Sequence, residues 1–136
     1  MTHLPDLYLK PSTRGGRGVF TASPIPAGSV VELSPVIILS EVERKLIHTT
    51  RLHDYYFLWA GGGAALALGY GSLYNHDATP NLDYELDYDF EQIRFQTLRD
   101  VTVGEELLID YMAGDEREGL WFDPVGSGSK SPVKHP

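Results

Sequence analysis

A loop rich in amide and imidazole side chains is the stretch of this sequence best equipped for chemistry. Asn75 and His76 are followed four residues later by Pro80 and Asn81, within an otherwise apolar run. Proline lacks an amide hydrogen and disfavours helical angles at the residue before it, while asparagine side chains tend to bond nearby backbone groups. These residues therefore predict a shaped loop rather than a strand or a helix.

A second stretch, about thirty residues downstream, ends in a tyrosine. Gly104 predicts a turn, and residues 105–111 predict a short apolar strand, the last of the core, with Tyr111 at its end. The loop and this strand together are far more specific than either alone.

Two other groupings suggest chemistry more weakly. Residues 83–90 alternate acidic with apolar or aromatic side chains, which predicts a half-exposed strand with its carboxylates in water. A glycosidase carboxylate pair is the alternative, disfavoured because no apolar pocket is indicated to raise one pKa. His48 and His53 lack partners at ligand spacing, and the chain has no cysteine, so we expect neither a metal site nor a disulfide.

The elements that must position these groups are short and mostly extended. A capping box formed by Ser40 and Glu43 predicts a helix from Ser40 to about His48. β-branched and aromatic residues predict two strands joined by a tight turn, residues 19–20 and 30–39, and further strands at residues 55–59 and 93–98. Residues 1–13 suit a loose lead-in with one short strand.

Three glycines, at positions 15, 16 and 18, let the backbone turn sharply and approach a ligand closely. Taken alone they indicate only a glycine-rich hairpin turn. They are not a dinucleotide fingerprint, because no helical pattern follows them.

In combination these stretches resemble the SET-domain protein lysine methyltransferases. That family's usual signature is an Asn-His-Ser-Cys-x-Pro-Asn loop followed by a Gly-Glu-Glu-Leu-x-Phe-Asp-Tyr strand, which residues 75–81 and 104–111 match closely. The glycine run with residues 25–32 resembles the family's opening motif, and Tyr55-Tyr56-Phe57 is similar to its Tyr-x-Phe strand. The matches occur in family order and span about residues 10 to 122.

The resemblance implies a mostly β fold of several short sheets, with one or two short helices and a C-terminal segment threaded like a pseudoknot, an exception to the rule against threading. At 136 residues the chain is long enough for one domain. We expect a lead-in at residues 1–9, the SET domain at residues 10–122 and a disordered tail rich in Gly, Ser, Pro and Lys at residues 123–136.

The resemblance also implies S-adenosylmethionine as cofactor. Its methionine part would contact Gly16, Arg17 and Gly18, mostly through the main chain. Asn75 and His76 match the pair that holds the adenosine end. Trp121 resembles an aromatic residue that packs on the cofactor in several family members, although its spacing is longer than usual. Tyr55 would lie beside both the cofactor and the methyl-transfer site.

For catalysis, the resemblance places the hydroxyl of Tyr111 near the transferring methyl group and the amine, and Asn81 as a tie for the loop. Where the family usually has an arginine, three positions before Asn75, this chain has Ser72. Ile109 stands where the family often has phenylalanine or tyrosine. The missing hydroxyl there should leave more room around the amine, so we expect di- or trimethylation.

The formal net charge of −8 excludes most nucleic-acid ligands and favours a basic protein segment, histone-like or otherwise, as partner. The sequence shows neither a leader nor an apolar run of membrane-spanning length, which predicts a soluble intracellular protein, cytoplasmic or nuclear, with no membrane partner. Without zinc-binding flanking modules, a second copy could complete the substrate channel, so a homodimer is a further prediction.

Two other functions compete with a methyltransferase. One is a catalytically silent SET-like scaffold that binds a basic partner through its acidic face. The other is an unrelated small β-domain that binds a sugar or a peptide. Retention of Asn75, His76 and Tyr111 argues against the silent scaffold, because a silent descendant could lose any of them freely. The unrelated domain would require four coincidental motifs.

Overall fold

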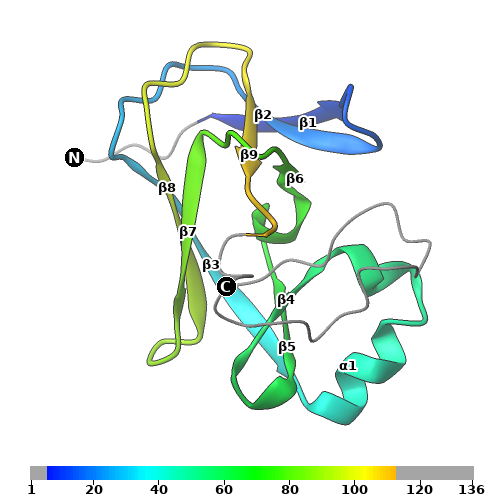
Figure 1. Cartoon of the computed structure of the whole chain (residues 1–136). Coiled ribbons are helices and arrows are strands. Elements are labelled where there is room, and N and C mark those ends of the chain that lie inside the picture. Colours follow the sequence, from blue (N-terminus) through cyan, green and yellow to red (C-terminus); the bar gives the residue numbers. More distant parts are fainter. Residues whose placement is uncertain (1–5, 113–136) are drawn as a thin grey trace.

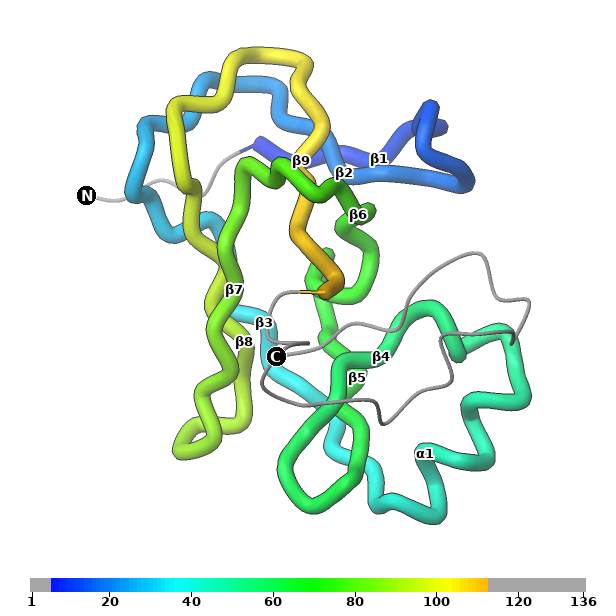
Figure 2. Tube along the Cα trace, in the orientation of Figure 1, coloured from blue at the N-terminus to red at the C-terminus, as the bar shows by residue number. Residues whose placement is uncertain are grey.

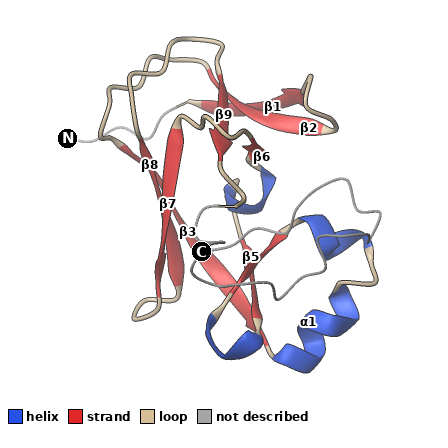
Figure 3. Ribbon diagram, viewed as in Figure 1, coloured by secondary structure: helices blue, strands red, loops and turns tan. Residues whose placement is uncertain are grey.

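The computed structural model describes residues 6–112 and is built mostly from short strands. Two curled sheets pack around a shared core; most of the helical segments lie at one end of the five-stranded sheet, and the one over residues 71–73 packs against a strand of each sheet (Figures 1 and 3). In chain order, the elements are β1 (Leu7–Pro11), β2 (Arg17–Thr21), β3 (Val30–Leu39), α1 (Glu41–Ile47), the 3₁₀ helix η1 (Arg51–Asp54), β4 (Tyr56–Leu58), the 3₁₀ helix η2 (Ala60–Gly62), β5 (Ala64–Ala67), the 3₁₀ helix η3 (Gly71–Leu73), β6 (Asn75–His76), β7 (Leu82–Asp87), β8 (Gln92–Thr97) and β9 (Glu106–Ile109).

The four-stranded sheet, in the order β1-β2-β9-β6, brings the two signature stretches together. β9 pairs antiparallel with β2 on one side and parallel with β6 on the other, where Asn75 faces Leu108 and His76 faces Ile109. The tube in Figure 2 shows β6 and β9 side by side although about thirty residues separate them. This parallel contact is what the predicted threading of the C-terminal segment requires.

The five-stranded sheet, in the order β4-β5-β3-β8-β7, supplies the rest of the core. β9, an inner strand of the four-stranded sheet, also contributes to the core: all four of its residues are buried, so its side chains pack on both faces of that sheet. The side chains with the least exposure come from both sheets and from the segments between them: Val19, Val31, Tyr56, Phe57, Tyr74, Leu82, Ile93, Phe95, Leu107 and Ile109.

The predicted helix is confirmed together with its cap. Oγ of Ser40 accepts a hydrogen bond from the Glu43 amide at 3.1 Å, and Oε1 of Glu43 accepts one from the Ser40 amide at 2.8 Å. This reciprocal capping box satisfies two amides that a helix end would otherwise leave without partners. α1 ends at Ile47, and His48 is its C-cap.

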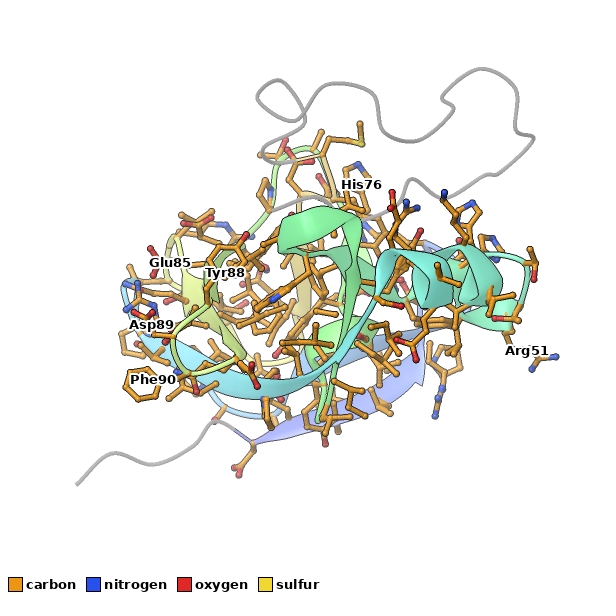
Figure 4. All side chains as sticks on the ribbon, turned by 90° about the horizontal axis from the view of Figure 1, so that it is seen from below. Arg51, His76, Glu85, Tyr88, Asp89 and Phe90 are labelled. Atoms are coloured by element: carbon orange, nitrogen blue, oxygen red, sulfur yellow. The ribbon has the colours of Figure 1, made fainter. Side chains whose placement is uncertain are left out.

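Two strand predictions need correction. Residues 17–21 and 30–39 are both strands, but they lie in different sheets and are not paired with each other; β2 forms its hairpin with β1 instead. The predicted strand over residues 83–90 ends at Asp87, because Oδ1 of Asp87 accepts the amides of Asp89 and Phe90 and closes a turn. Tyr88 and Phe90 are consequently 51% and 77% exposed. Figure 4 shows them on the side of the molecule opposite Arg51.

Within residues 6–112 no helix is long and apolar enough to cross a membrane.

Candidate active site

One cavity of about 270 Å³ collects side chains from four distant parts of the chain. Its wall is formed by the β1–β2 turn, by the end of η1 with the residue after it, by the segment around η3 and β6, and by the residue two positions beyond β9. The lining residues are Arg14, Gly15, Gly16, Arg17, Asp54, Tyr55, Ser72, Leu73, Asn75 and Tyr111. Five of the residues predicted for the site therefore meet here: Gly16, Arg17, Tyr55, Asn75 and Tyr111.

The glycine turn forms one wall through its main chain. Gly15 and Gly16 have φ of 106° and 59°, left-handed values that residues with a side chain rarely adopt. No heavy atom within 4 Å would meet a Cβ at either position, so open space adjoins their backbone. A ligand in the cavity can therefore approach this backbone directly.

Glu106 connects β9 with the β1–β2 turn and with β6 behind that wall, a role that was not predicted from the sequence. Its Oε1 accepts a hydrogen bond from Oγ of Ser12 at 2.8 Å, and its Oε2 accepts one from Nδ2 of Asn75 at 2.8 Å. Nη1 of Arg14 lies 3.6 Å from Oε1. Because this carboxylate is buried, these partners replace the water that it loses on folding. The available signal was the Gly-Glu-Glu motif, whose second glutamate falls within an otherwise apolar strand.

Gly18 serves packing rather than the cavity wall. A Cβ at this position would overlap the Glu106 carboxylate and come within 3.1 Å of Nδ2 of Asn75. Nδ2 of Asn75 also donates to the main-chain oxygen of Arg17 at 3.1 Å. The absence of a side chain at Gly18 thus allows Glu106 and Asn75 to meet, while its predicted contact with a cofactor stays a prediction.

Tyr111 is buried and forms part of the cavity wall. Its hydroxyl donates to the main-chain oxygen of Tyr74 at 2.8 Å, and its amide donates to Nδ1 of His76 at 2.9 Å. Burial raises the pKa of Tyr111 well above its ordinary value, and the negative charge of Asp54 adds to the effect. The phenol therefore stays protonated and its hydroxyl is held in one direction.

His76 lies behind Tyr111 and is not among the residues that line the cavity. Its ring centroid is 5.1 Å from that of Tyr111, and its Nδ1 accepts the Tyr111 amide. The structure thus gives His76 a positioning contact with Tyr111, and its predicted contact with adenosine stays a prediction. Trp121 belongs to residues 113–136, outside the part of the chain that the structure describes.

Glu32 fixes the carbonyl that Tyr111 uses. Its Oε1 accepts the hydroxyl of Tyr74 at 2.6 Å, and its Oε2 accepts the amide of Tyr70 at 2.8 Å. Tyr74 is fully buried, and burial raises its pKa well above the ordinary value, with the Glu32 carboxylate contributing. The β3 strand therefore holds the segment from which Tyr74 presents its main-chain oxygen to Tyr111.

Ser72, which replaces the arginine usual in the resembled family, has its own local role. Its Oγ accepts the amide of Ala67 at 2.9 Å, and both residues are buried. The side chain thus closes the connection between β5 and η3. A small hydroxyl suits this position, which also borders the cavity.

The SET domain family model matches residues 16–112, well over half of the chain. The chain belongs to the SET domain family. It is 40% identical over 124 residues to a Schizosaccharomyces pombe protein named "Histone-lysine N-methyltransferase, H3 lysine-37 specific". That alignment covers 90% of this chain and 81% of the relative. The predicted family and the predicted enzyme class, protein-lysine methyltransferase, are confirmed.

Solved structures of the family share this fold. A Plasmodium falciparum protein described as a "putative histone methyltransferase" superposes with a TM-score of 0.65 at 27% identity, covering 80% of this chain and 95% of that one. A chain in the structure of the Chaetomium thermophilum Polycomb Repressive Complex 2 superposes with a TM-score of 0.69 at 25% identity. The match covers 83% of this chain and 16% of that larger chain. The mostly β fold predicted from the sequence is therefore confirmed.

Proposed function

We propose that this SET domain transfers a methyl group from S-adenosylmethionine to the ε-amine of a lysine in a basic, histone-like protein segment. The observation that carries the proposal is the convergence of Gly16, Asn75, Tyr55 and Tyr111 on one cavity. The S. pombe relative, named for histone H3 lysine 37, supports a histone as the first substrate to test. The net charge of −8 favours the same class of partner.

The charged residues and the open main chain of the cavity suit S-adenosylmethionine. The cofactor's amino-acid part carries a carboxylate and an ammonium, and the residues that line the cavity include Arg17 and Asp54. The open space beside the main chain of Gly15 and Gly16 allows the close approach that a main-chain contact needs. Bound there, the cofactor would supply a methyl group on a sulfonium, which is electrophilic without a metal.

The remaining cofactor contacts would come from Asn75, from the β6 segment and from Trp121. Asn75 lines the cavity and its Nδ2 is bonded to Glu106, so its side-chain oxygen would be the atom that accepts a hydrogen bond from the cofactor. Nδ1 of His76 is bonded to the Tyr111 amide and its ring does not line the cavity. A contact of His76 with the adenosine part of the cofactor would therefore come from the main chain of β6. Trp121 retains its predicted role over the cofactor.

Tyr111 would orient the reacting groups rather than act as a base. Its raised pKa keeps the phenol neutral, and its hydrogen goes to the Tyr74 oxygen, so the hydroxyl oxygen can accept a hydrogen bond from the amine. Holding two reactants in near-attack geometry is worth up to about 7–11 kcal/mol. We expect Tyr111 to contribute part of this by fixing the direction of the amine lone pair.

The experiment compares the wild type with Tyr111→Phe and with Tyr8→Phe, which removes a hydroxyl remote from the cavity. Affinity for S-adenosylhomocysteine is measured by calorimetry, and methyl transfer to recombinant histone H3 by mass spectrometry. We expect Tyr111→Phe to lower kcat at least tenfold with cofactor affinity within about twofold of wild type, since one oriented hydrogen bond is lost near the reacting atoms. Tyr8→Phe should match the wild type.

A folded, monodisperse wild type that binds no S-adenosylhomocysteine would overturn the proposal. That outcome would favour the silent scaffold that binds a basic partner. Cofactor binding without methylation of histone H3 would keep the cofactor assignment and refute the histone substrate.

A further inference from the structure

The outer face of the five-stranded sheet carries three rows of side chains that run from β3 across β8 to β7. In each row β3 supplies an apolar residue, β8 a polar or basic residue and β7 a carboxylate, and none of these residues is buried. The rows are Val30 with Gln96 and Asp83, Leu33 with Arg94 and Glu85, and Pro35 with Gln92 and Asp87. This face therefore has an apolar side along β3 and an acidic side along β7.

An outer groove of about 460 Å³ lies on this face. It is lined by Val30, Leu33, Glu85, Asp87, Gln92 and Arg94. Val30 and Leu33 are 43% and 52% exposed, although both are large apolar residues. Exposed apolar side chains that line a groove, with polar groups at its border, are typical of an interaction site.

A β-bulge in β3 turns both apolar side chains outward. The register shifts between Val30 and Glu32, so β3 advances by two residues where β8 advances by one. In a regular strand, residues three apart point to opposite faces, and Val30 and Leu33 would be separated. The bulge lets Val31 enter the core, where it is 2% exposed, while Val30 and Leu33 share the outer face.

The outer groove has an excess of negative charge. Oε1 of Glu85 lies 2.5 Å from Nη2 of Arg94, in an ion pair whose two side chains are well exposed. Oδ1 of Asp87 accepts the amide of Phe90 at 3.1 Å, and this bond holds the pKa of Asp87 below its ordinary value, so the carboxylate stays ionised near pH 7. With Asp83, the three rows hold three carboxylates and one guanidinium. Because an exposed ion pair contributes little, Glu85 can exchange Arg94 for a cation of a partner.

These features fit a basic segment of another protein. β3 and β7 are two strand spacings apart, about 9–10 Å. In an extended segment, an apolar side chain packed on Val30 and Leu33 is followed two residues later, on the same face, by a side chain about 6.6 Å further along. A lysine or arginine there can extend across the remaining gap to Glu85 or Asp87. A second copy of this chain would instead bring a face with the same excess of carboxylates, which disfavours it.

The outer groove lies apart from the cavity. None of the described residues lines both. Figure 4 shows Glu85 on the side of the molecule opposite Arg51, and η1, which begins at Arg51, contributes Asp54 to the cavity wall. A segment bound in the outer groove therefore leaves the cavity accessible.

We propose that the outer groove binds a basic segment of the protein substrate, other than the segment that carries the target lysine. An apolar side chain of that segment contacts Val30 and Leu33, and a lysine or arginine pairs with Glu85 or Asp87. This inference rests on the proposed function and adds a second contact with the same substrate.

The test measures the affinity for labelled recombinant histone H3 by fluorescence anisotropy, without cofactor, in about 0.1 M salt. Glu85→Lys puts a cation in the outer groove, and Asp6→Lys makes the same charge change at an exposed position before β1. We expect Glu85→Lys to weaken binding about five- to tenfold, because attraction becomes repulsion, and Asp6→Lys to stay within about twofold of wild type.

A second pair of variants tests the apolar side of the groove at constant charge. Leu33→Ser should weaken binding about three- to fivefold, since it removes an apolar contact. Val103→Ser makes a similar change at a residue that is 61% exposed and does not line the outer groove, and it should match the wild type. Affinity for S-adenosylhomocysteine and kcat at saturating histone should stay unchanged in every variant, while KM for histone H3 rises in Glu85→Lys and Leu33→Ser.

Wild-type affinity for histone H3 in both Glu85→Lys and Leu33→Ser would overturn the inference and leave the proposed function intact. Equal weakening by Asp6→Lys would reduce the effect to net charge and overturn it as well. A light-scattering mass of two chains for the wild type and one chain for Glu85→Lys would assign the outer groove to a second copy, again overturning the inference. A wild type that binds histone H3 through Glu85 but transfers no methyl group would refute the proposed function and keep the binding surface.

Discussion

Asn81 gives the sharpest test of how the signature loop is held. It is only 1% exposed, and its side chain bridges two main-chain groups around β9. Nδ2 donates to the oxygen of Glu106 at 2.8 Å, and Oδ1 accepts the amide of Leu108 at 2.8 Å. The side chain thus supplies partners to a strand whose neighbour on that side is only the two-residue β6.

Replacing Asn81 with alanine would leave both main-chain groups buried without these partners. Each buried, unsatisfied group costs about 1–3 kcal/mol, so we expect the free energy of unfolding to fall by about 2–6 kcal/mol. Domains of this kind have a total stability of about 5–15 kcal/mol, so the loss should be large in any assay. Urea unfolding followed by circular dichroism, with the wild-type slope retained, measures it directly.

The matched control is Gln96→Ala, which removes an amide side chain from a half-exposed position on β8. Its only side-chain hydrogen bond recorded among the described residues goes to Gly28 at 3.4 Å. We expect this control to change the free energy of unfolding by no more than about 0.5 kcal/mol. If Asn81→Ala behaved like Gln96→Ala, the reasoning that the loop is tied through Asn81 would be wrong.

Three further predictions concern Gly18, Asp77 and Ile109. Gly18→Ala should displace the Glu106 carboxylate, cost about 1.5–3 kcal/mol of stability through a lost hydrogen bond to a charged group, and weaken S-adenosylhomocysteine binding in calorimetry; wild-type affinity would contradict this. The hydrogen bond from Arg14 lowers the pKa of Asp77, so its stabilisation is present above the unfolded-state pKa and is lost as pH falls through the lowered folded value. The stability gap between wild type and Asp77→Asn should therefore close in acid, and a gap independent of pH from 7 to 2.5 would refute that role. Ile109 should permit di- or trimethylated product in mass spectrometry, and exclusively monomethylated lysine would refute it.

Features that depend only on residues close together in the sequence were predicted correctly. The capping box at Ser40 and Glu43 determines where α1 begins, and Pro80 with its neighbours interrupts regular structure after β6. The strand before Tyr111 was also predicted, although it ends at Ile109 rather than at the tyrosine. In each case, local hydrogen bonding or backbone sterics favours one conformation without help from the rest of the chain.

Contacts between distant residues could not be predicted in this way. Ser12 and Glu106 are 94 residues apart in sequence, and nothing near either residue indicates the other. The same holds for the pairing of β2 with β1 and β9 instead of β3, since a glycine and proline-rich connection is compatible with several partners. Asp54 follows β3 and α1 in the chain, but its place in the cavity wall beside Asn75 and Tyr111 depends on how η1 packs against the other segments.

By itself, the sequence determined the family, the mostly β fold and the choice of Gly16, Asn75 and Tyr111 as candidate site residues, because these depend on motifs that occur in order along the chain. Only the tertiary structure decided what surrounds them: the buried carboxylate of Glu106, the carbonyl of Tyr74 that receives the Tyr111 hydroxyl, and the place of Asp54 in the cavity wall. The physical reason is that a motif specifies local backbone conformation and side-chain chemistry, whereas burial, charge and hydrogen-bond partners arise only when the core packs distant segments together.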